Sequence, residues 1–301
     1  MHTVGHKLYR ISWWTTTSNR VIDCHVHVIP LEMMKPDVRQ VFTASKTYDP
    51  HVYTQIMSPK GLVQVLDRDG VEWANIISYP APEVMGFGHT LVEFVGNYCK
   101  EYQDRLRPVV SVDPIRDDNP VSLLEEYRSR FGSNWVKLHP VHQLFKPNAY
   151  IEDGPLYKKL AGVYEYAEAN RITLTFHTGT SIFPHARIKY GDPLLLDDVA
   201  VDYPKLKIVM AHGGRPFWTQ QAYFLLRRHS NVYLDISGIP QAKLLEYFPR
   251  LLEVWEKAIF GSDWPTMGVK SIADCVRQLS ALGLPRQVLD GILYENIRKL
   301  V

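Results

Sequence analysis

The segment Val21-Ile22-Asp23-Cys24-His25-Val26-His27 decides how the rest of this chain is interpreted. It is a short apolar run that ends in two histidines separated by one residue. Because residues i and i+2 of a β-strand point to the same face, His25 and His27 would project side by side from one strand end. Histidine is the commonest metal ligand, so the pair predicts part of a metal site. The alternative is a pair of half-exposed histidines with no ligand.

The composition is that of a soluble globular protein with a large core. Of the 301 residues, 46% are hydrophobic and 22% are charged, and the formal net charge is +2. This balance predicts neither a nucleic-acid nor a membrane partner. Three widely spaced cysteines without a C-x-x-C pair argue against a disulfide scaffold, and neither a signal peptide nor a membrane-spanning run is evident. The expected location is the cytoplasm.

Apolar runs typical of buried strands alternate with helical patterns eight times. The predicted strands are Val21–His27, Trp73–Tyr79, Arg107–Pro114, Trp135–Pro140, Ile172–His177, Lys207–His212, Asn231–Asp235 and Ala258–Asp263. Strands that are apolar on both faces belong to parallel sheets, and eight strand–helix units predict an α/β fold, a single (β/α)8 TIM barrel. A doubly wound sheet is the alternative, but Val28-Ile29-Pro30 stands where its glycine-rich turn would be.

The domain organisation follows from this pattern. Residues 1–20 are expected to form a short N-terminal extension on the outside of the fold, and residues 21–301 a single metal-dependent catalytic barrel. Two long connections, 28–57 and 180–193, are expected to be irregular loops, and loops of this length are usually functional. They are the expected source of substrate specificity. A helix is expected to run from the seventh strand through Lys257.

Polar side chains gather at the predicted carboxyl ends of the strands, which converge on one face of a barrel, where catalytic residues lie. They are His25, His27, Lys137, His139, His177, His212 and Asp263. Three imidazoles and one carboxylate, with an open position for water, make the ligand set of a catalytic zinc site. The alternatives are hydrogen-bonded core histidines, and for Asp263 a helix N-cap.

Short motifs occur in a fixed order between residue 21 and the end of the chain. They are Ile22-Asp23-Cys24-His25-Val26-His27, Val112-Asp113-Pro114, Val136-Lys137-Leu138-His139-Pro140, Phe176-His177-Thr178-Gly179, Gly191-Asp192-Pro193-Leu194, Met210-Ala211-His212-Gly213-Gly214, Gly261-Ser262-Asp263-Trp264-Pro265 and Tyr294-Glu295-Asn296. With these motifs the chain resembles the amidohydrolase superfamily. The branch it resembles contains metal-dependent TIM-barrel hydrolases and aminocarboxymuconate-semialdehyde-type decarboxylases.

The resemblance implies one divalent metal ion, zinc or alternatively manganese. Its ligands would be His25, His27, His177 and Asp263, and His212 would be the general base or would polarise the water. His212 as a further ligand is an alternative. Asp263 could also move a proton to the leaving group. Bound zinc brings the pKa of its water from about 16 to about 7, which suits hydrolysis at neutral pH.

Several other residues are candidates for binding the substrate: Lys137, His139, Arg215 and Trp264. Lys137 is predicted to be an internal ion-pair partner, although a carboxylated lysine at this position bridges two metals in some members of the superfamily. Arg215 is a candidate for binding a carboxylate. Asp235 is expected to be structural, and His142 to be a surface or packing residue.

Two reactions fit these residues. The first is hydrolysis of an ester, lactone or amide of a small molecule by a metal-activated water; the second is non-oxidative decarboxylation of an aromatic or unsaturated acid. An arginine in the connection after the first strand would favour an acid substrate, and Arg39 is the only one there. A metal-binding barrel without turnover is a third hypothesis, and a homodimer is the expected assembly.

Overall fold

The computed structural model of the protein describes residues 20–152 and 154–301, and in these ranges it contains eight parallel strands. The strands are β1 (Val21–His27), β2 (Val71–Ile77), β3 (Leu106–Val109), β4 (Trp135–Leu138), β5 (Thr173–His177), β6 (Lys207–Ala211), β7 (Val232–Asp235) and β8 (Ala258–Ile259). The predicted extension, apart from Arg20, lies outside the described residues.

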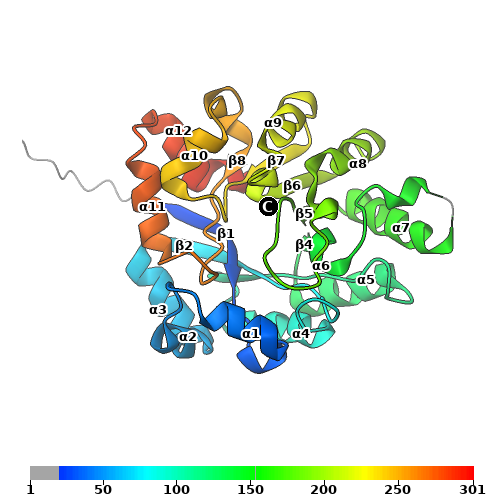
Figure 1. The fold of residues 1–301 in the computed structure, drawn as a ribbon, viewed down its shortest axis with the longest axis horizontal. Helices are drawn as coiled ribbons and strands as arrows, with labels where there is room; N and C mark the ends of the chain where they lie inside the picture. Colours follow the sequence, from blue (N-terminus) through cyan, green and yellow to red (C-terminus); the bar gives the residue numbers. More distant parts are fainter. Residues whose placement is uncertain (1–19, 153) are drawn as a thin grey trace, which may run out of the picture.

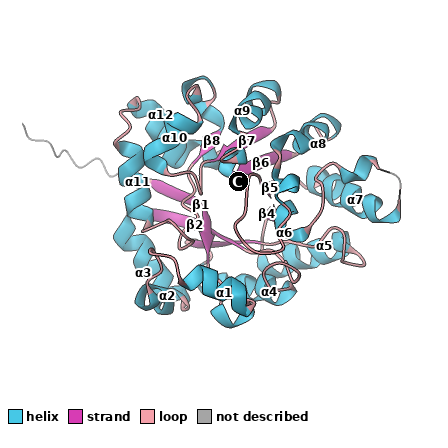
Figure 2. Ribbon diagram, viewed as in Figure 1, coloured by secondary structure: helices cyan, strands magenta, loops and turns pink. Residues whose placement is uncertain are grey.

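Helices surround the strands as an outer ring (Figures 1 and 2). They are α1 (Pro36–Thr43), α2 (Pro50–Ile56), α3 (Pro59–Asp69), α4 (His89–Cys99), α5 (Pro120–Phe131), α6 (Pro140–Gln143), α7 (Pro155–Ala169), α8 (Asp197–Asp202), α9 (Thr219–Arg228), α10 (Leu244–Tyr247), α11 (Ile272–Ser280), α12 (Arg286–Asp290) and α13 (Asn296–Arg298). None of the helices in the described ranges has the length and apolar character needed to cross a membrane.

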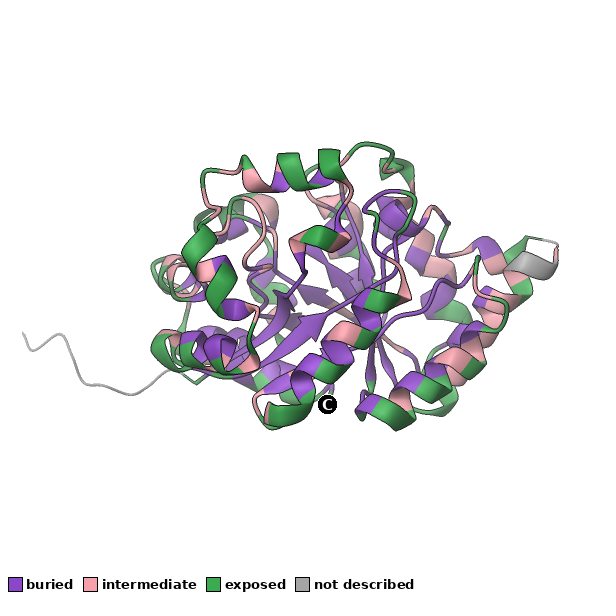
Figure 3. Cartoon of the chain, turned by 90° about the horizontal axis from the view of Figure 1, so that it is seen from below, coloured by how far each residue is buried: buried purple, intermediate pink, exposed green. Residues whose placement is uncertain are grey.

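The strands form two parallel sheets, β1–β2–β3 and β4 to β8, that together make the predicted TIM barrel. Isolated bridges join the sheets at both seams, between Val26 and Trp264 and between Val110 and Val136. The strand interiors are buried, as the purple centre of Figure 3 shows. Most buried residues of the strands are apolar, with Asp23, Asn75 and Thr175 among the exceptions, and the polar side chains named above lie at or just beyond the carboxyl ends of the strands.

The sequence also explains where several helices begin and end. Ser58 caps α3 by accepting a hydrogen bond from the Gly61 amide, and Pro59 takes the first helical position. Gly70 ends the helix in the left-handed conformation (φ 73°) that glycine adopts without strain. Residue types that favour helix ends therefore stand at both ends of α3.

Four predicted elements are wrong, and one of them is the third strand, which was expected to run to Pro114 but ends at Val109 as β3. The connection 28–57 is not irregular, because it contains α1 and α2, each started by a proline, with Asp49 capping α2 through the His51 amide. The helix expected before Lys257 is reduced to α10 and short 3-10 turns. Pro240 and Pro249, which lack an N–H, interrupt this stretch. Strand β8 stops at Ile259, and the Ser262 amide donates to the Asp23 carboxylate instead of to a neighbouring strand.

Candidate metal and active site

A cleft opens at the carboxyl ends of the strands, with a volume of about 910 Å³ including its mouth. It is lined by nearly all of the residues that the sequence singles out: His25, His27, Lys137, His139, His177, His212, Arg215 and Asp263. Trp264 does not line it; the indole is buried and faces a separate hollow beside α2. Arg39 is exposed on α1 and does not line the cleft either.

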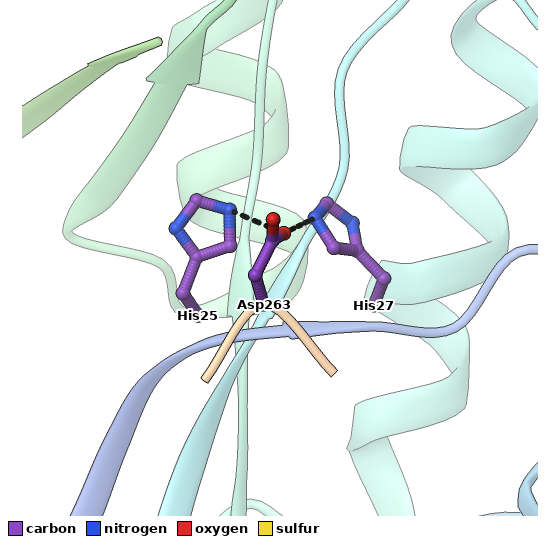
Figure 4. Close-up of side chains that lie close together, drawn as sticks. All are labelled: His25, His27 and Asp263. Carbon is purple, nitrogen blue, oxygen red and sulfur yellow. Dashed lines mark ion pairs between the residues drawn. The ribbon is translucent and has the colours of Figure 1, made fainter. Parts of the chain in front are cut away.

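His25, His27 and Asp263 form the tightest group in the cleft (Figure 4). Asp263 Oδ1 lies 3.2 Å from His27 Nε2 and 3.7 Å from His25 Nε2. The backbone holds this geometry, because the Asp263 amide donates to the His25 carbonyl at 2.8 Å and the His27 amide to the Trp264 carbonyl at 2.9 Å. Two ring nitrogens and a carboxylate oxygen, all within 4.8 Å of one another, are a donor set that fits a divalent metal ion.

The tautomer of His25 suits a ligand. Its Nδ1 lies 2.5 Å from Asp235 Oδ2. Although burial alone would raise the pKa of Asp235, His25 lowers it to about 2, so the carboxylate is ionised and accepts the Nδ1 proton. Burial and the nearby Lys137 ammonium lower the pKa of His25, which keeps the ring neutral and leaves the Nε2 lone pair on the Asp263 side. Asp235 therefore positions a predicted ligand.

His212 is a neutral imidazole with one ring nitrogen available as an acceptor. Its Nδ1 donates to the Ser237 carbonyl at 2.8 Å, so the second nitrogen of the neutral ring carries a free lone pair. Burial lowers the pKa of His212 well below its ordinary value, although Asp263 opposes the shift. The His212 ring centroid is 5.1 Å from that of His25, which places this neutral imidazole next to the donor group.

Asp263 is an ionised carboxylate in this setting. Burial alone would raise its pKa, but His212, His27 and His25 around it hold the pKa well below the usual range. The residue adopts a positive φ of 64°, which turns its side chain back toward β1. This orientation distinguishes Asp263 from the helix N-cap that the sequence left open, because none of the described helices begins beside it.

His177 lies in the cleft but outside the tightest group. Its ring stacks on His139 at 3.9 Å between centroids and lies 4.8 Å from His212. In the structure its Nε2 donates to the Thr180 carbonyl at 3.3 Å, an interaction that a metal bound at this nitrogen would replace. The ligand role of His177 stays a prediction.

Four further residues shape the site: Tyr79 and Ser237, which no sequence pattern singles out, Asp235, which was expected to be structural, and His142, which was expected to be a surface or packing residue. His142 is buried in the cleft wall, stacks on His139 at 3.7 Å, and contacts Tyr79 Oη and Ser181 Oγ at 3.1 and 2.8 Å. A signal existed only for Asp235, which ends β7 at the same level as the other strand-end groups. His142 follows Pro140, and its position depends on the short turn of α6.

Two cationic side chains face the cleft. Lys137 is buried, and its Nζ lies 3.4 Å from His25 Nε2; burial lowers its pKa to about 8. Arg215 is half-buried, and its Nε has no hydrogen-bond partner among the described residues. No described carboxylate lies within ion-pair distance of the Arg215 guanidinium. Among the described residues, Arg215 is therefore a cation in the cleft that has no ion-pair partner.

Solved structures with the same fold come from several bacteria. An uncharacterised TIM-barrel protein from Bordetella bronchiseptica is 20% identical over 93% of this chain and 98% of its own, with a TM-score of 0.73. A probable 2-pyrone-4,6-dicarboxylic acid hydrolase from Acinetobacter baumannii, with citric acid bound, is 18% identical (93% and 98% covered, TM-score 0.64). A dihydroxybenzoic acid decarboxylase from Polaromonas, with manganese and an inhibitor bound, is 16% identical (93% and 96%, TM-score 0.63).

The sequence itself assigns the family. No curated protein matches the chain in sequence. The profile of the amidohydrolase family, however, matches residues 22–301, from the second residue of β1 to the end of the chain. The match includes every residue of the site described above. With this match and its barrel fold, the chain belongs to the amidohydrolase family.

Proposed function

We propose that this protein is a metal-dependent hydrolase that cleaves an ester, lactone or amide bond of a small carboxylic acid. The observation that carries the proposal is the combination of a metal donor set with a neutral base beside it: His25, His27 and Asp263 converge, and His212 carries a free ring nitrogen. The family and its fold support an enzyme, and the residues of this cleft support hydrolysis.

One divalent ion, with zinc proposed and manganese as the alternative, would be held by His25, His27 and Asp263, with His177 as a fourth ligand. Bound there, it would supply Lewis acidity toward the substrate carbonyl and make a water molecule more acidic. These are the chemical contributions that the protein side chains cannot make.

The side chains account for the proton transfers. His212 accepts a proton from the attacking water at Nε2, while its Nδ1–H stays fixed on the Ser237 carbonyl. Asp263 lies at the same point of the cleft and, as an ionised carboxylate, can accept the second proton of the water after its attack and pass it to the leaving group, while His212 releases the first proton to solvent. The guanidinium of Arg215 binds the substrate carboxylate, and Lys137 adds positive charge next to His25.

Decarboxylation is the second candidate, and the unpaired Arg215 suits the acid substrate of this reaction as well. In that reaction Arg215 and the metal would bind an aromatic acid, and protonation of a ring carbon would precede loss of carbon dioxide. The two reactions share all the residues named here, so only products distinguish them.

The test has two parts. Protein purified under metal-replete conditions should contain about one transition-metal ion per chain. It should then be incubated with lactones, aryl esters and hydroxybenzoates, measuring acid release and carbon dioxide release separately. We expect acid release that is lost in His212→Asn and kept in His229→Asn, a matched control in which the replaced histidine lies outside the cleft. Carbon dioxide release alone would assign the alternative, and absence of metal would refute the proposal.

A further inference from the structure

The two sides of the cleft differ in chemical character. The charged groups that line it, Lys137, Arg215 and Asp263, come from β4 and from the segments after β6 and β8. The segments after β1 and β2 contribute apolar side chains: Ile29, Met34, Phe42 and Met85, all at most 6% exposed. In a ring of eight strands, β2 and β6 are diametrically opposed. The side built by the segments after β1 and β2 therefore carries no charged group, whereas the side of Lys137 and Arg215 carries charged groups together with the apolar Ile182 and Phe183.

Backbone contacts hold the apolar end together. The Lys35 amide donates to the Met85 carbonyl at 2.9 Å, which ties the segment after β1 to the segment after β2. The two segments can come this close only because residue 86 is glycine. A Cβ at Gly86 would lie 2.7 Å from the Lys35 nitrogen, and the φ of Gly86 is 101°. Behind it, Phe42 packs against the rings of Tyr48 and Tyr53. The apolar wall formed by Met34, Phe42 and Met85 is therefore held in place by backbone hydrogen bonds and by packing of aromatic rings.

Among the described residues that line the cleft, Lys137 and Arg215 are the cationic side chains, and neither belongs to the segments that form this wall. Lys35 is the nearest in sequence, and its ammonium is bound to the Glu83 carbonyl and does not line the cleft. Arg39 is exposed on α1. A negatively charged group placed against Met34 and Met85 would lose its hydration without gaining a partner, and an unpaired buried carboxylate is strongly unfavourable.

We propose that the substrate is a monoanion with an uncharged apolar body, bound with its carboxylate at Arg215 and its body between Met34, Met85 and Phe42. The proposal rests on the proposed function, because it places the reacting bond at the His25–His27–Asp263 group, between these two ends. Thioether side chains suit such a body, since they are flexible and polarizable and pack well against aromatic rings. Substrates with a second carboxylate at the far end are excluded by the same wall.

A matched pair of probes tests this assignment without turnover. Benzoate and terephthalate share one ring and differ by a second carboxylate at the far end. By titration calorimetry on the metal-loaded protein, we expect benzoate to bind more tightly by about tenfold or more, because the second carboxylate has no partner. Equal or tighter binding of terephthalate would overturn the proposal, and this comparison needs no variant.

Variants locate the two ends. Met34→Lys would supply a cation at the apolar end and should bring the two affinities close together, whereas Met33→Lys, in the same turn but outside the cleft, should preserve the preference. Arg215→Gln should weaken both ligands; unchanged benzoate affinity would refute the carboxylate position. If the preference for benzoate stands but no ester or lactone is turned over, the proposed function fails and the specificity assignment survives.

Discussion

Asp235 Oδ2 lies 2.5 Å from His25 Nδ1, and this contact joins the end of β7 to the end of β1. The Ser237 amide holds the other carboxylate oxygen at 2.8 Å. The pair fixes both the tautomer and the direction of the His25 ring, so that Nε2 points to Asp263. Such outer carboxylates make a ligating histidine more basic and better oriented.

Asp235→Asn should therefore weaken metal binding by about 10- to 100-fold, because the amide no longer accepts the Nδ1 proton as a carboxylate does. The measurement is competition with a chelator of known affinity. Asp202→Asn makes the same chemical change on the surface of α8, where the carboxylate accepts from Tyr150, and should bind metal normally. Equal affinity in the two variants would show that Asp235 has no positioning role.

Substitution of two neighbouring histidines should separate binding from chemistry. His177→Ala is expected to lose the metal, since His177 is predicted to complete the ligand set. His212→Ala is expected to keep the metal and lose activity, because it removes the base whose Nδ1 is held by Ser237. Metal content by elemental analysis and hydrolysis rate report the two effects. The opposite pattern would exchange the two roles.

The barrel could be predicted from the sequence because each of its strands is recognisable from a short stretch of neighbouring residues. Each strand is a continuous apolar run, and the strand-end positions of His25, His177 and His212 follow from the register alone. The two helices between residues 28 and 57 were missed because their composition, rich in proline and polar residues, resembles that of a loop. The short helical turns there form because tertiary packing of Phe42 and Tyr53 outweighs weak local preference.

The partners of the site could not be predicted, because they depend on contacts between distant segments. Nothing near Asp235 in the sequence indicates that it faces His25, 210 residues away. The place of His142 depends on α6, which turns the chain back immediately after β4. Trp264 lies outside the cleft because the chain turns at Asp263. No sequence pattern predicts the positive φ of Asp263.

Gly238 keeps two site residues in place. A Cβ at this position would lie 2.6 Å from His212 Nδ1 and 2.7 Å from Arg215 Nη2. Gly238→Ala should therefore displace the base and the guanidinium, and a displacement of about 1 Å can reduce the rate by roughly 100-fold. Metal content should stay normal, since none of the predicted ligands lies within this contact.

The control for Gly238 is another glycine with a positive φ. Gly238 and Gly283 have φ values of 63° and 70°, but a Cβ at Gly283 would meet nothing within 4 Å. Both alanine variants should lose about 1–2 kcal/mol of stability from the left-handed conformation. Only Gly238→Ala should lose activity. Equal rates in the two variants would show that the contact with His212 and Arg215 has no influence on the reaction.

His142 makes the folded protein sensitive to acid. Burial, followed by the charges of Lys137 and His27, lowers its pKa from 6.5 to about 3. Between these values the unfolded chain binds a proton that the folded protein does not, so stability falls as the pH is lowered, by up to about 1.4 kcal/mol per pH unit from this one group. In urea unfolding at matched metal concentration, His142→Gln should reduce the slope of the unfolding free energy with pH between 6.5 and 3. Ser181→Ala removes the partner of His142 Nε2, and with it the acceptor of the Phe183 amide, and should lower stability without removing that slope. An unchanged slope in His142→Gln would mean that His142 is not a source of the acid sensitivity.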